Sequence, residues 1–259
     1  MTGAAAAIKP GSLFLVPTPL DFGCAVEAPL SDVLPLHTVQ TAARITHWIS
    51  ENAKSTRAFL KRINSLQPLA SPLQQLQIQE LPHAVHKKGD HLGQFDATPL
   101  LAPALQGFDI GLVSEAGMPA VADPGSSVVR AAHDLGIAVV PLVGPVSLLL
   151  ALAASGLNGQ NFAFIGYLPS DGDQRRDQLR QLESLALKSG QSQIFIETPY
   201  RNAALLQALL RDLQPNTRLC VSRGLTLAAS QVVSKTVKDW KKSPMPLDNA
   251  TPAVFAIGR

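Results

Sequence analysis

Short apolar segments alternate with amphipathic ones along most of this chain, and this alternation limits the fold more than any other feature. Residues 12–17 (SLFLVP) and 109–114 (DIGLVS) are brief apolar runs that lead into turn-forming stretches, so each is predicted to be a buried strand. The second run leads through SEAGMPAVADPG to SSVVRAAHDLG, whose apolar residues share one helical face, with Ser126 as the expected cap and Gly136 as the stop. Strands followed by helices in this way predict βαβ units.

The same alternation continues to residue 223. A strand (IAVVPLVG), a buried helix (PVSLLLALAASG), a strand (NFAFIGYL) and an amphipathic helix (DQRRDQLRQLESLALKSG) follow in order. A strand, a helix and a strand come next, at QIFIE, RNAALLQALLRDL and RLCVSR. We therefore predict the α/β class, with mainly parallel sheets in two α/β domains. The predicted divisions are a flexible tail at residues 1–10, an N-terminal domain at 11–143 and a C-terminal domain at 144–259.

The stretch from Ser65 to Pro103 breaks this pattern. It is rich in Gln, Pro and His and has little periodicity, so it is expected to be an irregular surface excursion. Its acids and histidines fit no zinc spacing, and solvated loop residues are favoured over a metal site. The residues concerned are His83, His86, Asp90, His91 and Asp96. No metal is expected.

The formal net charge of +3 is mildly basic. It permits an anionic partner such as RNA without requiring one, because the lysines and arginines form no dense block. The alanine run in MTGAAAAIKP is too short and too weakly apolar for a signal peptide or a membrane span. Cys24 and Cys220 are far apart and fit a reducing compartment. A cytoplasmic protein without a membrane partner is expected.

Three loops rich in glycine or proline each follow a predicted strand. They are PTPLDFG at residues 17–23, SEAGMPAVADPG at 114–125 and VGPVS at 143–147. In an open α/β sheet, ligands bind beyond the carboxyl ends of the strands. None of the loops contains G-x-G-x-x-G or a P-loop lysine. A single such loop is commonly a tight turn, but three together favour a ligand site.

Five motifs resemble, in order, the successive motifs of the tetrapyrrole methylase family. They are LVPTPL, GLVSEAGMPAVADPGSSVVRAA, VVPLVGPVSLLLALAASGL, FAFIGYLP and IFIETPYR, and they run from about Leu13 to Arg223. The resemblance implies an S-adenosylmethionine-dependent methyltransferase with two α/β domains, the cofactor in the cleft between them, and a symmetric homodimer. The branch that it resembles most methylates the ribose 2′-hydroxyl of ribosomal RNA.

Carried over position by position, the resemblance also implies a set of cofactor-binding residues. Asp123, Pro124 and Gly125 are expected instead to shape the turn into the next helix. The implied cofactor residues are Pro17, Thr18, Pro19, Ser114, Glu115, Ala116, Gly117, Met118, Pro119, Gly144, Pro145, Ser147, Glu197, Thr198 and Pro199.

The ribosomal branch usually has an AEDTR-like motif, and the matching stretch here is SENAKSTR. Glu51 keeps the acid, whereas Asn52 and Lys54 replace Asp and Arg. Glu51 and Lys54 are the candidate catalytic residues, as bases for an acceptor hydroxyl. The alternatives are that Lys54 pairs with an RNA phosphate, or that both belong to a solvated helix start.

The late run KTVKDWKKSP carries Lys235, Lys238, Lys241 and Lys242 around Trp240. It fits either an RNA surface or an exposed turn with one anchoring tryptophan, of which the turn is favoured. Two alternatives to an RNA methyltransferase also stay open. One is methylation of a tetrapyrrole or another small molecule, and the other is a non-catalytic protein that binds S-adenosylmethionine.

Overall fold

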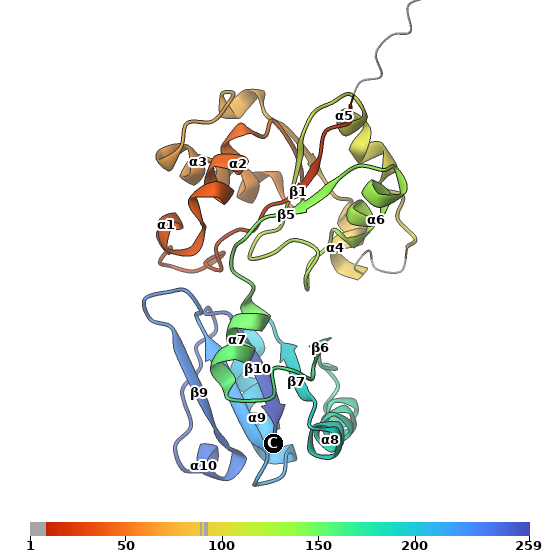
Figure 1. Cartoon of the computed structure of the whole chain (residues 1–259). Coiled ribbons are helices and arrows are strands. Elements are labelled where there is room, and N and C mark those ends of the chain that lie inside the picture. The colour runs from red at the N-terminus through yellow and green to blue at the C-terminus, as the bar shows by residue number, and fades with distance from the viewer. Residues whose placement is uncertain (1–8, 89, 91–92) are drawn as a thin grey trace, which may run out of the picture. The chain divides into compact units, whose positions relative to one another are not determined.

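The computed structural model describes residues 9–88, 90 and 93–259. The chain forms two compact units: Met1–Phe22 with Pro29–Pro145, and Gly23–Ala28 with Val146–Arg259. Each unit holds one five-stranded sheet with helices packed against it (Figure 1). The tail predicted at residues 1–10 lies outside the described residues except for Lys9 and Pro10.

The sheet of the first unit is parallel throughout. Its strands lie in the order β3-β2-β4-β1-β5. The predicted strands at residues 12–17, 109–114 and 137–144 contain β1, β4 and β5, which confirms them. The bounds are β1 (Leu13–Leu15), β2 (His47–Ser50), β3 (Gln77–Glu80), β4 (Ile110–Val113) and β5 (Val139–Pro141).

Helices cover both faces of this sheet (Figure 1). On one face, α2 and α3 pack over a core that includes Trp48, Phe59 and Leu60. On the other face, α5 and α6 enclose a second core that includes Ile110 and Val128. The helical segments are α1 (Leu30–Val33), α2 (Leu36–Arg44), α3 (Ala53–Leu66), η1 (Leu73–Gln75), α4 (His83–Lys88), η2 (Thr98–Leu101), α5 (Ala102–Leu105) and α6 (Ser126–Asp134).

The middle of the first unit is more regular than expected. The prediction of an irregular stretch from Ser65 to Pro103 is wrong for β3, which pairs with β2 at the sheet edge, and for the helical segments that flank it. β3 reads QIQE and only Ile78 is partly buried, so the apolar run that marks a buried strand is missing. His91 and the side chain of His86 lie outside the described residues.

The second unit has a mixed sheet in the order β6-β7-β10-β8-β9. Only β6 and β7 pair in parallel, because β10 enters between β7 and β8 in the opposite direction. The α/β class with two sheets is confirmed, and this sheet differs in direction from the parallel one expected. The bounds are β6 (Phe162–Tyr167), β7 (Ser192–Ile196), β8 (Arg218–Arg223), β9 (Gln231–Thr236) and β10 (Ala253–Gly258).

Two cores fill the second unit. Phe195 and Phe255 stack at 6.0 Å between ring centroids, in a core shared with α8, α9 and Trp240. On the other face, α7 packs through Leu148 and Leu152, whereas its Leu149 and Leu150 are exposed, so this helix is buried on one side only. The helical segments are α7 (Ser147–Ser155), α8 (Gly172–Ser189), η3 (Pro199–Arg201), α9 (Asn202–Asp212) and α10 (Val237–Lys242).

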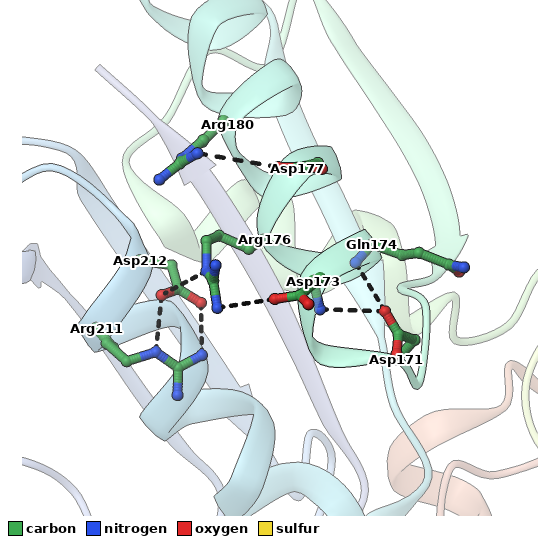
Figure 2. A network of polar contacts seen from close by, with 8 residues as sticks. All are labelled: Asp171, Asp173, Gln174, Arg176, Asp177, Arg180, Arg211 and Asp212. Atoms are coloured by element: carbon green, nitrogen blue, oxygen red, sulfur yellow. Dashed lines mark hydrogen bonds and ion pairs between the residues drawn. The ribbon is translucent and has the colours of Figure 1, made fainter.

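Acids and arginines alternate where α8 and α9 meet (Figure 2). Arg176 pairs with Asp173 at 3.1 Å, and Arg211 pairs with Asp212 at 2.7 Å. The carboxylate of Asp171 caps α8 by accepting hydrogen bonds from the amides of Asp173 and Gln174. The positive charges on this face are therefore balanced by neighbouring carboxylates.

Candidate functional site

The first two predicted loops are joined by their backbones. The amide of Thr18 donates to the carbonyl of Gly117 at 3.0 Å, and the amide of Gly117 donates to the carbonyl of Thr18 at 3.1 Å. The hydroxyl of Thr18 also donates to the carbonyl of Ser114 at 3.2 Å. Because β1 and β4 are neighbouring parallel strands, their carboxyl ends bring these loops together.

The third loop, which follows β5, lies against the first. A Cβ added to Gly144 would fall 2.2 Å from Cγ of Pro17, so only glycine fits there. The hydroxyl of Thr38 fixes the same loop by donating to the carbonyl of Val143 at 2.7 Å. The loops after β1, β4 and β5 thus meet at one edge of the first sheet.

Four of the predicted cofactor residues belong to the second unit. Ser147 begins α7, and Pro199 begins η3 directly after Thr198. The buried carboxylate of Glu197 accepts a hydrogen bond from the amide of Thr198 at 2.8 Å and pairs with Arg201 at 3.0 Å. The charge of Glu197 is therefore compensated within its own unit.

Glu51 lies at the carboxyl end of β2 and reaches the second loop. Its Oε2 accepts a hydrogen bond from the amide of Glu115 at 3.1 Å. The next residue, Asn52, is the N-cap of α3, and its side chain accepts hydrogen bonds from the amides of Lys54 and Ser55 at 2.9 and 3.3 Å. The structure therefore places Glu51 at the loop edge, and Lys54 on the exposed first turn of α3.

A third carboxyl group, that of Asp123, completes an acidic cluster with Glu51 and Glu115. Burial first, and then the negative charges of Glu51 and Glu115, raise the pKa of Asp123 to about 7, against a smaller lowering effect of the Ser114 side chain. Perturbed carboxyl groups of this kind occur often at functional sites. The sequence predicts only a turn-shaping role for Asp123. It shows that an acid is present there, but not that the fold brings the carboxyl groups of Glu51 and Glu115 close to it.

The buried carboxylate of Asp90 holds the far end of the same loop. It accepts hydrogen bonds from the amides of Gly125 and Ser127, both at 2.9 Å, and from the hydroxyl of Ser126 at 2.7 Å. Gly125, with φ of 133°, is the N-cap of α6. The expectations that Asp90 is solvated and that Ser126 caps this helix are therefore wrong, because the cap comes from a side chain 35 residues earlier.

The loop between these fixed ends is strained. Ala120 and Ala122 have φ values of 63° and 67°, in the left-handed region that alanine rarely adopts. Such conformations persist only where the surrounding structure imposes them, and they cluster at ligand sites. The conformations of the two alanines therefore favour a ligand-binding role for this loop.

Across residues 9–88, 90 and 93–259, no group of three His, Cys, Asp or Glu side chains is arranged to hold a metal ion. Among the helices of these same residues, none is long and apolar enough to cross a membrane.

Comparisons with known proteins agree with this geometry. The family model for tetrapyrrole (corrin/porphyrin) methylases matches residues 36–240. A ribosomal RNA small subunit methyltransferase I from Xylella fastidiosa is 31% identical over 250 residues, which cover 96% of this chain and 81% of that protein. The protein of the same name from Vibrio cholerae is 38% identical over 137 residues, which cover 53% of this chain and 46% of that protein. This second match thus spans about half the length of the relative.

A solved structure shares the fold. The methyltransferase CobJ is 19% identical, with a TM-score of 0.56, and the likeness covers 96% of this chain and 94% of that one. At this level of identity, the likeness bears on the fold alone.

Proposed function

The chain belongs to the tetrapyrrole methylase family, and on this premise we propose that it is an S-adenosylmethionine-dependent methyltransferase acting on RNA, at a ribose 2′-hydroxyl of the small ribosomal subunit. The observation that carries the proposal is the hydrogen bond from the amide of Glu115 to Glu51. It brings the acid of the AEDTR-like position to the loop in which the cofactor is expected. The names of the relatives support the RNA acceptor.

The residues at this edge suit the proposed cofactor. S-adenosylmethionine carries a positive sulfonium and an ammonium group, and the carboxyl groups of Glu51, Glu115 and Asp123 lie close enough for their charges to interact. Glycine at positions 117 and 144 lets the loops approach one another closely, because an added Cβ would meet the side chains of Leu20 and Pro17. When bound, the cofactor supplies a methyl group on an already activated sulfur.

The proposed cofactor residues remain those of the sequence, with Asp123 added. In the first unit they lie on the three joined loops: Pro17, Thr18, Pro19, Ser114, Glu115, Ala116, Gly117, Met118, Pro119, Gly144 and Pro145. In the second unit they are Ser147, Glu197, Thr198 and Pro199. A homodimer is part of the same proposal and rests on the family resemblance, whereas a cytoplasmic location rests on the two separate cysteines, Cys24 and Cys220.

The acceptor hydroxyl must lose its proton as it attacks the methyl group. We assign this step to the carboxylate of Glu51, where the bond from the Glu115 amide to Oε2 fixes the side chain. Lys54 is better placed for a phosphate, because its side chain lies on the exposed face of α3. The proton would pass from the ribose oxygen to Glu51 and then to water.

The first prediction tests this activity. The protein is expected to transfer tritiated methyl groups from S-adenosylmethionine to small ribosomal subunits prepared without this modification. Digestion with ribonuclease should release the label, which shows that it is in the RNA. Glu51→Gln is expected to slow transfer by about 10²- to 10⁴-fold, because a positioned base is lost. Glu80→Gln is the matched control, since Glu80 ends the neighbouring strand β3 and bonds the amide of Ala53.

Other outcomes would separate the alternatives. Label in a small molecule and none in RNA would point to the tetrapyrrole-type reaction. Calorimetric binding of the cofactor without transfer to any acceptor would identify a non-catalytic binding protein. Equal rates of methyl transfer for Glu51→Gln and Glu80→Gln would show that Glu51 is not the base that accepts the proton.

The second prediction concerns Gly117. Its φ is 80°, and an added Cβ would lie 3.1 Å from Cδ2 of Leu20, inside the joint between the loops. Gly117→Val is expected to weaken S-adenosylhomocysteine binding by more than about tenfold, which corresponds to about 1.4 kcal/mol. Gly136→Val is the matched control, because Gly136 has a similar φ of 68° and nothing within 4 Å of its added Cβ. Calorimetry and thermal unfolding of both variants separate lost binding from backbone strain, and equal affinities would contradict the placement of this loop at the cofactor.

A further inference from the structure

Helix α3 carries an unusual set of charges. Between Ala53 and Leu66 it has four cations and no acidic residue. One of the four, Arg62, is already used: its guanidinium makes two hydrogen bonds to the buried carboxylate of Asp21, at 3.1 and 3.0 Å. This pair fixes α3 to the loop that follows β1, so the helix is held firmly beside the candidate site.

The other three cations, Lys54, Arg57 and Lys61, form one exposed stripe. Their spacing places them within an arc of about 60° on an α-helix, with about 10 Å between the first and the last along the axis. The opposite face of the helix is buried through Phe59, Leu60 and Ile63. No salt bridge involves these three cations within the described residues.

Several cations elsewhere in the chain already have a partner. Lys242 of α10 pairs with Asp239 at 2.8 Å, and Lys235 lies over the ring of Trp240 at 4.8 Å. On α8, Arg176 pairs with Asp173 (Figure 2). The buried Trp240 anchors α10 by donating to the carbonyl of Leu219 at 2.8 Å. Two of the four lysines in the late run therefore already have a partner, whereas none of the three cations of the stripe on α3 has a salt bridge within the described residues.

Both ends of the stripe lie beside features that suit an RNA strand. Its first turn follows directly on Glu51 and Asn52, at the loop edge. Its last cation, Lys61, lines a groove of about 320 Å³ together with the polar side chains of Asn64 and Ser71 and the apolar ones of Leu69, Pro72 and Leu73. Apolar walls favour the burial of a base, and a neighbouring cation can neutralise the phosphate attached to it.

We propose that this surface, defined as Lys54, Arg57, Lys61 and the groove at Lys61, binds the RNA strand that flanks the acceptor nucleotide. The proposal rests on the proposed function and names the part of the chain that holds its substrate. The cations neutralise phosphates along the strand, and the groove receives a base. Because α3 begins two residues after Glu51, a strand bound along it leads to the edge where methyl transfer is proposed.

The third prediction tests this surface by its salt dependence. The probe is a fluorescein-labelled, unstructured single-stranded RNA, bound to the full chain loaded with S-adenosylhomocysteine in about 50 to about 200 mM KCl. Arg57→Gln with Lys61→Gln is expected to weaken binding and to reduce the slope of log affinity on log salt by about 1.4, since each phosphate contact contributes about 0.7. Lys238→Gln with Lys241→Gln removes the same charge from α10 and is expected to keep the wild-type slope.

A third variant tests the groove without a change of charge. Ala70→Trp adds bulk to a residue that lines it, and is expected to lower the RNA affinity while the slope stays the same. Wild-type affinity in both the α3 double variant and Ala70→Trp would overturn the proposal, as would a loss of slope in the α10 pair alone. Those results would leave the methyl-transfer activity standing. A wild-type chain that neither binds nor methylates RNA would instead contradict the proposed function itself.

Discussion

Asp90→Ala is expected to lower the free energy of unfolding by about 3 kcal/mol, because it removes a buried charged acceptor and leaves amide donors at the start of α6 without a partner. The carboxylate accepts hydrogen bonds from Gly125, Ser126 and Ser127, so its loss frees both the helix start and the end of the strained loop. The proposed cofactor affinity is expected to fall together with the stability.

The pH dependence of this effect has a definite sign. Burial alone would favour the neutral acid, but hydrogen bonds from Ser127, Ser126 and Gly125 outweigh it and hold the pKa of Asp90 below its ordinary value. The stabilisation is therefore fully present above about pH 4 and is lost as the pH falls through the lowered pKa. Urea unfolding of the wild type and the variant should converge in acid.

Asp96→Ala is the matched control for this experiment. Asp96 is an exposed acid a few residues away that accepts a hydrogen bond from the amide of Thr98 at 2.9 Å. Its loss is expected to cost less, since water replaces the missing bond. Equal destabilisation by the two variants would show that the Asp90 cap does not hold the loop.

Asp123→Asn is expected to act in the opposite direction, raising stability while weakening the binding of a cationic ligand. The pKa of Asp123 is raised to about 7 by burial and by the charges of Glu51 and Glu115, so the folded chain resists its ionisation. An acid with a raised pKa makes the fold less stable as the pH rises from about 4 to about 7. The amide removes that cost, and at about pH 8 the gain is expected to be about 1–3 kcal/mol, with solvent screening allowed for.

The binding of the cofactor is expected to show what the buried carboxyl group of Asp123 does for function. A sulfonium ligand favours ionised Asp123, so the affinity of the wild type for S-adenosylmethionine is expected to rise as the pH passes through about 7. S-adenosylhomocysteine lacks the sulfonium charge and should show a weaker rise. Calorimetry across this range is expected to give a flatter curve for Asp123→Asn.

Asp134→Asn provides a control with the same change of charge, because Asp134 is an exposed acid at the end of α6. Its pH profile should match the wild type. Parallel pH profiles for Asp123→Asn and the wild type would place the titrating group elsewhere. A destabilised Asp123→Asn would restore the simpler role of a turn-shaping residue.

The apolar pattern predicts the strands that are buried in the sheet and fails where burial is incomplete. The runs SLFLVP and DIGLVS become β1 and β4, which are covered by helices on both faces. QIQE becomes β3 at the sheet edge, where three of its four residues are exposed and leave no apolar signal. The direction of β10 depends on neighbours far away in the sequence, so the local alternation does not reveal it.

The same limit applies to the candidate site. The loops could be found from the sequence because their glycines and prolines are adjacent in the chain. The cap from Asp90 and the acidic cluster around Asp123 could not, because they depend on side chains that only the fold brings together. Acids at these positions are visible in the sequence, but their burial and their partners are not.

The two reciprocal bonds between Thr18 and Gly117 bear on how such a chain can change during evolution. Each of these residues donates to and accepts from the other, so neither loop can be displaced without breaking contacts of both. The two loops therefore form one rigid unit, although about a hundred residues separate them in the chain. If the exposed face of α3 binds RNA as proposed, its side chains can vary, and substrate preference with them, while the paired loops stay the same.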